Sequence, residues 1–109
     1  MTYADTTAQA NRFLSDAVMR LKALPFSDFV VWPEYPDRSP IDLRIPATLS
    51  QYIFTLTKET LPGGQIRIAL QRRQLNAGHG TRGLVVDGFV IASDEISRSL
   101  NQREVWYLT

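Results

Sequence analysis

Residues 52–71, YIFTLTKETLPGGQIRIALQ, contain two alternating segments joined by a turn sequence. In residues 52–57 and again in residues 66–71, apolar side chains recur at every second position, which is the period of a half-buried strand. Between them, Leu61-Pro62-Gly63-Gly64 supplies a backbone φ preset by proline and two glycines that are free to take positive φ. The stretch therefore predicts an antiparallel β-hairpin.

A helix is predicted on the N-terminal side, from about residue 6 to residue 24. Thr6, with Gln9 three positions later, has the spacing of a capping box, in which two side chains satisfy the backbone amides at a helix start. Pro25 disfavours helical backbone at the residue before it and ends the segment. Apolar residues recur at helical spacing, at Phe13, Leu14, Ala17, Val18, Leu21 and Leu24. The helix is expected to bury this one stripe.

Four further regions are rich in β-favouring residues and are predicted to contain strands. They are 26–32, 41–45, 84–92 with a bulge or bend at Asp87-Gly88, and 105–108. Residues 33–40 hold three prolines and residues 76–83 hold three glycines, so both are expected to be loops. Residues 96–101 fit either a helical turn or a returning strand.

This order of segments predicts the fold class. One helix precedes about five or six strands, and no helical pattern long enough to form a crossover lies between the strands. We therefore expect a single α+β domain over residues 1–109. Its N-terminal amphipathic helix should pack on one face of an antiparallel sheet.

The composition excludes several kinds of site. The chain has no cysteine, so disulfides, thiolate metal sites and cysteine nucleophiles are absent. No apolar run approaches the roughly 20 residues that a membrane span needs. Residues 1–10 lack the basic and apolar stretches of a secretory signal, which favours a cytoplasmic location.

Motifs for catalysis and for cofactors are weak. The single histidine, His79, lies between Gly78 and Gly80, and the carboxylates are scattered, so we expect neither a metal nor a cofactor. Gly78-x-Gly80-x-x-Gly83 matches the dinucleotide-binding spacing, but a strand-like segment follows it where a helix is required. A small-ligand-binding or enzymatic domain that uses His79 stays open as an alternative.

Arginines gather in residues 61–86, which contain no acidic residue. The side chains in question are Arg67, Arg72, Arg73 and Arg82. On an extended strand, Arg67 and Arg73 fall on one face and Arg72 on the other. A weak nucleic-acid binder is therefore an alternative function. The net charge of +1, from 12 basic and 11 acidic residues, provides no strong field to attract nucleic acid.

The loop after residue 31 offers the best candidate surface for a protein partner. It contains Trp32, Tyr35, Pro36 and Arg38, and Pro33-x-x-Pro36-x-Arg38 has the spacing of a polyproline ligand. Aromatic side chains beside prolines provide rigid contact area, although both rings could instead fold back onto the core.

Taken together, these features favour a small, non-enzymatic protein-binding or regulatory domain. The partner is another protein or a second copy of this chain. A homodimer is expected if Ile53 and Val90 both lie on the sheet face away from the helix, because that face would then be partly apolar.

Overall fold

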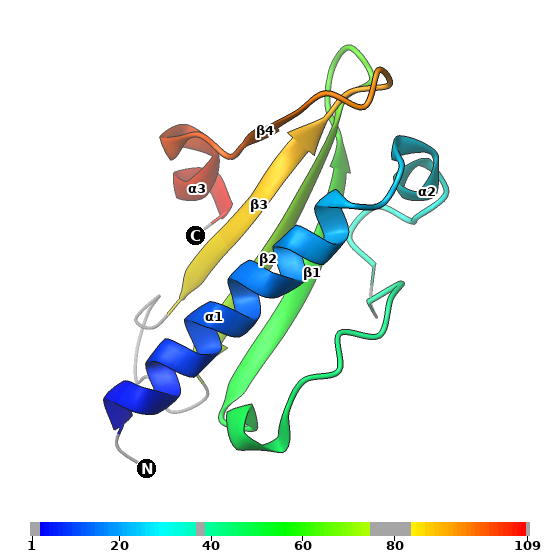
Figure 1. Cartoon of the computed structure of the whole chain (residues 1–109). Coiled ribbons are helices and arrows are strands. Elements are labelled where there is room, and N and C mark those ends of the chain that lie inside the picture. Colours follow the sequence, from blue (N-terminus) through cyan, green and yellow to red (C-terminus); the bar gives the residue numbers. More distant parts are fainter. Residues whose placement is uncertain (1–2, 37–38, 75–83, 109) are drawn as a thin grey trace.

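The computed structural model describes residues 3–36, 39–74 and 84–108 (Figure 1). It has the expected α+β class, with one antiparallel sheet in the strand order β1-β2-β3-β4. The helices are α1 (Tyr3–Lys22), α2 (Phe26–Val30), the 3-10 helix η1 (Ala47–Leu49) and α3 (Gln102–Leu108). The strands are β1 (Tyr52–Thr60), β2 (Ile66–Gln74), β3 (Val85–Ile91) and β4 (Ser97–Ser99).

The predicted hairpin is confirmed, and both of its strands are longer than the sequence pattern indicates. β1 and β2 pair over nine residues each, from Tyr52 opposite Gln74 to Thr60 opposite Ile66. The turn is closed by the Leu61 amide, which donates to the Gln65 carbonyl at 2.7 Å. Gly63 and Gly64 have φ values of 91° and 87°, which side chains with a Cβ rarely adopt.

The N-terminal helix is also confirmed, and it crosses one face of the sheet (Figure 1). It begins at Tyr3 rather than at the predicted Thr6 and ends at Lys22 rather than at residue 24. The main core lies between α1 and the sheet, and we call this side of the sheet the α1 face. Its buried side chains are Leu14, Ala17, Val18, Leu21, Phe29, Leu43, Leu56, Ile66, Ile68, Leu70, Phe89 and Ile91.

The number of strands was predicted wrongly, because the described residues form four strands and not five or six. Residues 26–30, predicted as part of a strand, form α2. α2 buries Phe29, and Trp32, just after the helix, packs against it with ring centroids 4.9 Å apart and nearly perpendicular. Pro25, in extended conformation, precedes the first turn.

Residues 41–45 are not a strand either. The Arg44 amide donates to the Asp42 carboxylate at 2.9 Å, and Arg44 has a φ of 52°, so the backbone turns where a strand would continue. Ile41 and Leu43 still pack against the core, which explains their alternation in the sequence.

The C-terminal segment forms α3 rather than a strand. Asn101 and Glu104 cap this helix reciprocally, because the Glu104 amide donates to the Asn101 side chain at 2.9 Å and the Asn101 amide donates to the Glu104 carboxylate at 3.0 Å. The open alternative for residues 96–101 is settled in favour of a returning strand, β4, which pairs with Phe89–Ile91.

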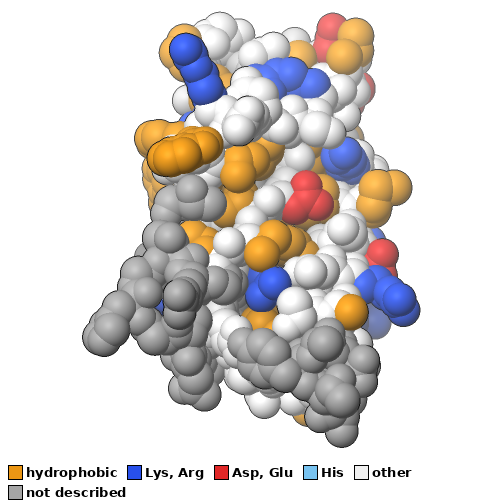
Figure 2. Space-filling model, turned by 90° about the vertical axis from the view of Figure 1, so that its left-hand side faces the viewer, with side chains coloured by type: hydrophobic (Ala, Val, Ile, Leu, Met, Phe, Trp, Pro, Cys, Tyr) orange, Lys and Arg blue, Asp and Glu red, His pale blue; other side chains and the backbone are white. Residues whose placement is uncertain are grey.

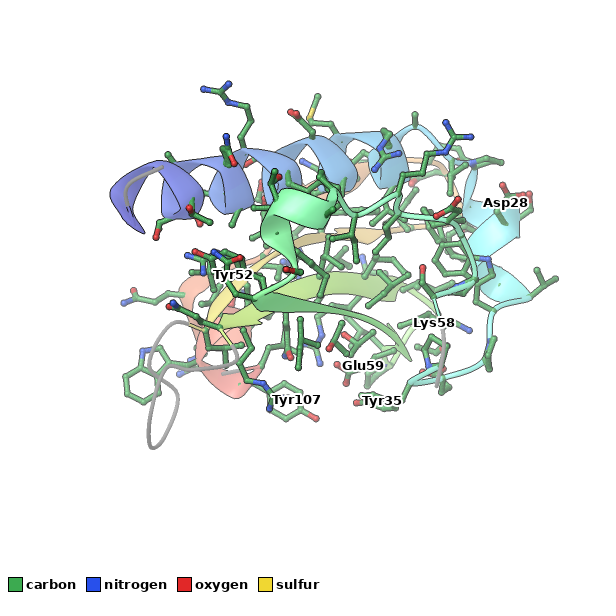
Figure 3. The ribbon with its side chains drawn as sticks, turned by 90° about the horizontal axis from the view of Figure 1, so that it is seen from below. Asp28, Tyr35, Tyr52, Lys58, Glu59 and Tyr107 are labelled. Atoms are coloured by element: carbon green, nitrogen blue, oxygen red, sulfur yellow. The ribbon has the colours of Figure 1, made fainter. Side chains whose placement is uncertain are left out.

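β3 continues through Asp87-Gly88 in regular register, so the predicted bulge is absent from it. Gly88 lies directly opposite Ala69 of β2. A Cβ at Gly88 would lie 2.1 Å from the Ile68 carbonyl oxygen, so only glycine allows the two strands to approach this closely. Seen from below, α1 and α3 lie on opposite sides of the sheet (Figure 3).

Candidate functional site

The face of the sheet opposite α1, which we call the second face, carries the candidate site. Residues directly opposite each other on antiparallel strands point to the same side. The pairs of β1 and β2 on the second face are Ile53 with Arg73, Thr55 with Gln71, Thr57 with Ala69, and Glu59 with Arg67. α3 contacts β3, and on the β1 side of this face Thr55 is exposed while Ile53 and Thr57 are half-buried.

An ion cluster holds α3 on the second face. Arg67 donates to Glu59 at 2.8 Å and to Glu104 at 3.2 Å, and Arg98 donates to Glu104 at 2.6 Å. Burial on its own would raise the pKa of Glu104, but the hydrogen bonds from Arg98, the Asn101 amide and Arg67 outweigh it and lower that pKa to about 2. Glu104 is therefore ionised in the folded protein at any ordinary pH.

Small residues lie on the sheet beneath α3. Ala69 and Gly88 are adjacent on the second face and are buried, so α3 can lie close to β3. The Gln71 side chain donates to the Leu108 carbonyl at 2.6 Å and fixes the far end of the helix. Val90 lies on this face as well but is buried, so only Ile53 of the predicted apolar pair stays accessible.

Two tyrosines from distant segments meet over the open part of the face. Tyr35 and Tyr107 point toward each other, with Glu59 beside them (Figure 3). Hydrogen bonding to the Glu59 carboxylate, followed by desolvation and by Tyr107, raises the pKa of the Tyr35 phenol. The Tyr107 ring also lies over the Arg67 guanidinium, with its centroid 5.0 Å from Cζ. The rings nevertheless remain accessible, with Tyr35 53% and Tyr107 66% exposed.

The segment that carries Tyr35 is fixed to the outer edge of β1. The Tyr35 amide donates to the Lys58 carbonyl at 3.2 Å, and the Glu34 carboxylate accepts the Thr60 amide at 3.0 Å. On the α1 face, the buried Lys58 ammonium donates to the Trp32 carbonyl at 2.9 Å. We call the surface formed by Tyr35, Ile53, Thr55, Thr57, Glu59, Arg73 and Tyr107 the tyrosine face.

The fold places the residues predicted for protein binding in different environments. Trp32 is partly buried and packs edge-on against Phe29 in the core. Tyr35 lies on the tyrosine face, and Pro36 is half-buried next to it in the chain. Arg38 lies outside the described residues.

The predicted arginines that the structure describes also lie on different faces of the sheet. Arg67 and Arg73 are on the second face and Arg72 is on the α1 face, as the alternation of a strand requires. Arg72 is only 4% exposed, donates to the Asn11 side chain at 2.8 Å and stacks on Tyr52. Arg73 is exposed, whereas Arg82 and His79 lie outside the described residues.

Two of these arginines are therefore engaged by the protein's own side chains. On the side of the molecule shown in Figure 2, the basic side chains are spread among hydrophobic and acidic ones rather than gathered in one patch. Nucleic-acid binding would require such a patch, and this side of the molecule does not show one.

Comparison with protein-family models, curated proteins and solved structures gives no significant match. Within the described ranges, no group of three histidine, aspartate or glutamate side chains could hold a metal ion. None of the described helices combines the length and the apolarity that a bilayer span requires.

Proposed function

We propose that this domain binds another protein through the tyrosine face. The observation that carries the proposal is the pair of exposed tyrosines, Tyr35 and Tyr107, which come from distant parts of the chain and meet over one carboxylate. Tyrosine is enriched at protein interfaces because it offers a large apolar ring and a polar hydroxyl at a low entropic cost.

The segments that carry both rings are held in place in the absence of a partner. Tyr35 is fixed by the backbone bond to Lys58, and Tyr107 is on a helix fastened by the Glu104 ion cluster. A preorganised surface loses little conformational entropy on binding, so more of the contact energy appears as affinity.

The chemistry of the face indicates the kind of partner. Thr55 and Thr57 provide an uncharged, hydrogen-bonding floor, and Glu59 is neutralised by Arg67. Arg73 is exposed at one end of the floor, beside Ile53. The matching segment has an apolar side chain that packs against the exposed tyrosine rings and a carboxylate near Arg73.

A photo-crosslinking amino acid at Thr55 tests the proposal. The protein would be irradiated in nuclease-treated lysate of its native host, and the crosslinked protein would be identified by mass spectrometry. The same amino acid at Ser15, on the exposed side of α1, is the matched control. We expect a partner that crosslinks from Thr55 and not from Ser15.

The purified partner then allows a quantitative test. Thr55→Arg places a long charged side chain in the centre of the face and is expected to weaken binding by about tenfold or more. Ser15→Arg should leave the affinity unchanged. Equal affinities of the two variants would contradict the proposal, and a crosslinked dimer of this chain would identify the partner as a second copy.

A further inference from the structure

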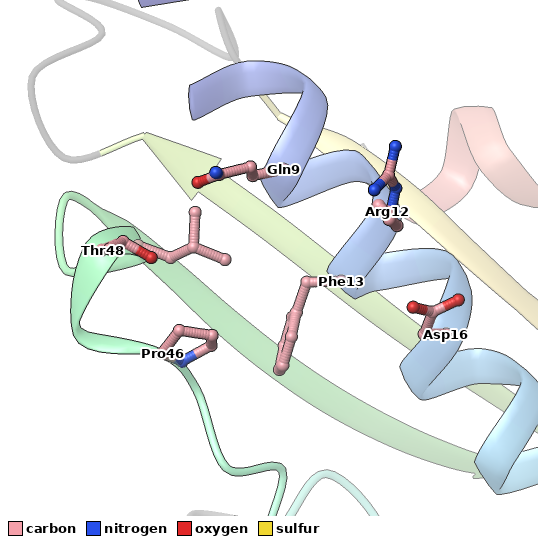
Figure 4. A pocket seen from close by; sticks show the side chains of 7 residues that line it. Gln9, Arg12, Phe13, Asp16, Pro46 and Thr48 are labelled. Carbon is pink, nitrogen blue, oxygen red and sulfur yellow. The ribbon is translucent and has the colours of Figure 1, made fainter. Parts of the chain in front are cut away.

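A pocket lies on the other side of the molecule, between α1 and the segment that contains η1 (Figure 4). Its volume is about 320 Å³, near the lower end of the range of small-molecule sites. The apolar part of its lining consists of Phe13, Pro46 and Leu49. Phe13 projects from α1 toward the segment opposite (Figure 4). The ring is fixed there by edge-on packing against Phe54 at 4.8 Å.

The rim of the pocket carries one charge of each sign. Arg12 and Asp16 are one helical turn apart on α1, and both line the pocket. Neither is in an ion pair with any described residue, although the spacing would allow them to pair with each other. Arg20, two turns beyond Arg12, is instead engaged, because it donates to the Leu43 carbonyl at 3.2 Å.

We propose that this pocket binds a free amino acid with an apolar side chain. Its carboxylate would pair with Arg12 and its ammonium group with Asp16, while its side chain would lie against Phe13 and Leu49. Gln9 and Thr48, which complete the lining, offer further hydrogen-bonding groups. A zwitterion of this size satisfies both charges of the rim and the apolar wall together.

This site is independent of the tyrosine face, because α1 covers the opposite side of the sheet. The pocket is open and small, so we expect a dissociation constant of about 0.1–1 mM. Because the two sites lie on opposite sides of the sheet, the failure of either proposal would leave the other intact.

Titration of the ¹⁵N-labelled protein with L-leucine, followed by amide chemical shifts, tests the inference. We expect saturable shifts confined to residues 9–16 and 47–49. Leucinamide lacks the carboxylate and N-acetyl-leucine lacks the ammonium group, and each is expected to bind at least tenfold more weakly. The absence of saturable shifts at 10 mM leucine, about ten times the weakest expected dissociation constant, would overturn the proposal.

The comparison compounds also distinguish a free amino acid from the end of a peptide. Full binding of leucinamide would assign the pocket to a peptide N-terminus, and full binding of N-acetyl-leucine would assign it to a C-terminus. Either result would overturn the proposal of a free amino acid.

Variants of the rim complete the test. Arg12→Gln and Asp16→Asn are expected to weaken leucine binding about tenfold without changing the melting temperature, because both side chains are exposed. Arg103→Gln, on the exposed surface of α3, is the matched control and should bind leucine like the wild type. Unchanged binding in both rim variants would contradict the assignment.

Discussion

Glu104 is a buried carboxylate that accepts hydrogen bonds from two guanidinium groups. Glu104→Gln would leave Arg67 and Arg98 without that charge, and we expect the free energy of unfolding at pH 7 to fall by about 2–4 kcal/mol. Urea unfolding measures this loss. Asp42→Asn, which removes an exposed ion pair with Arg44, is the control and should change stability by less than about 0.5 kcal/mol.

The same residue makes stability depend on pH. Because folding lowers the pKa of Glu104 from 4.5 to about 2, the folded state gains stability above pH 4.5 and loses it as the pH falls toward 2. Urea midpoints measured across this window should fall steeply for the wild type and less steeply for Glu104→Gln. Parallel pH profiles of the wild type and Glu104→Gln would show that Glu104 does not cause this loss of stability at low pH.

Among the described glycines, Gly88 is the one at which an added Cβ meets other backbone atoms. The added Cβ of Gly88→Ala would collide with the Ile68 carbonyl oxygen and with the Ala69 Cα, so the strands must separate. We expect a loss of about 2 kcal/mol or more in thermal or chemical unfolding. Gly64→Ala meets no atom within 4 Å and is strained only by its positive φ, so it should cost less.

At the scale of elements, the sequence predicts those whose hydrophobic period is long and whose ends carry clear signals. The β1-β2 hairpin meets both conditions, whereas α1 has the long period and an end signal at Pro25 but begins before the Thr6–Gln9 spacing that predicts its start. The segment 26–30 is too short for its period to distinguish a helix from a strand, and its aromatic composition misleads. For 105–108, the capping-box spacing of Asn101 and Glu104 was present in the sequence and outweighs the β-propensity of Val105 and Trp106.

The cap of α3 can be tested separately. Asn101→Ala removes the side chain that accepts the Glu104 amide, and we expect a loss of about 1 kcal/mol. Hydrogen exchange should accelerate in residues 102–108 and stay unchanged in the β1-β2 hairpin. Gln102→Ala is the control. Uniform acceleration through the whole domain would indicate that α3 does not open by itself.

At the scale of the whole molecule, the tyrosine face depends on contacts between distant parts of the chain. Tyr35 could be selected from the sequence as an aromatic residue beside prolines. Glu59 and Tyr107 could not, because nothing local in the sequence indicates that residues 35, 59 and 107 meet. Arg72 shows the reverse case, since a residue in a basic stretch is buried against α1 and Tyr52.

The position of Tyr35 depends on a buried lysine on the other side of β1. Lys58→Met keeps much of the side-chain volume but removes the hydrogen bond to the Trp32 carbonyl and the ion pair with Glu34. We expect a loss of about 1–3 kcal/mol and faster hydrogen exchange at residues 32–36, with weaker binding of the protein partner. Arg103→Gln should change none of these. Unaltered exchange at 32–36 would show that Lys58 does not hold this segment.

The two tryptophans of the chain lie in contrasting environments. Trp32 is packed against Phe29, whereas Trp106 is 77% exposed on α3, next to Tyr107 in the chain. The intrinsic fluorescence therefore contains two separable reporters. In Trp106→Phe the remaining emission follows unfolding of the core, and in Trp32→Phe it follows events at the second face. Changes in the core and changes at α3 can thus be followed by separate tryptophans, without an added label.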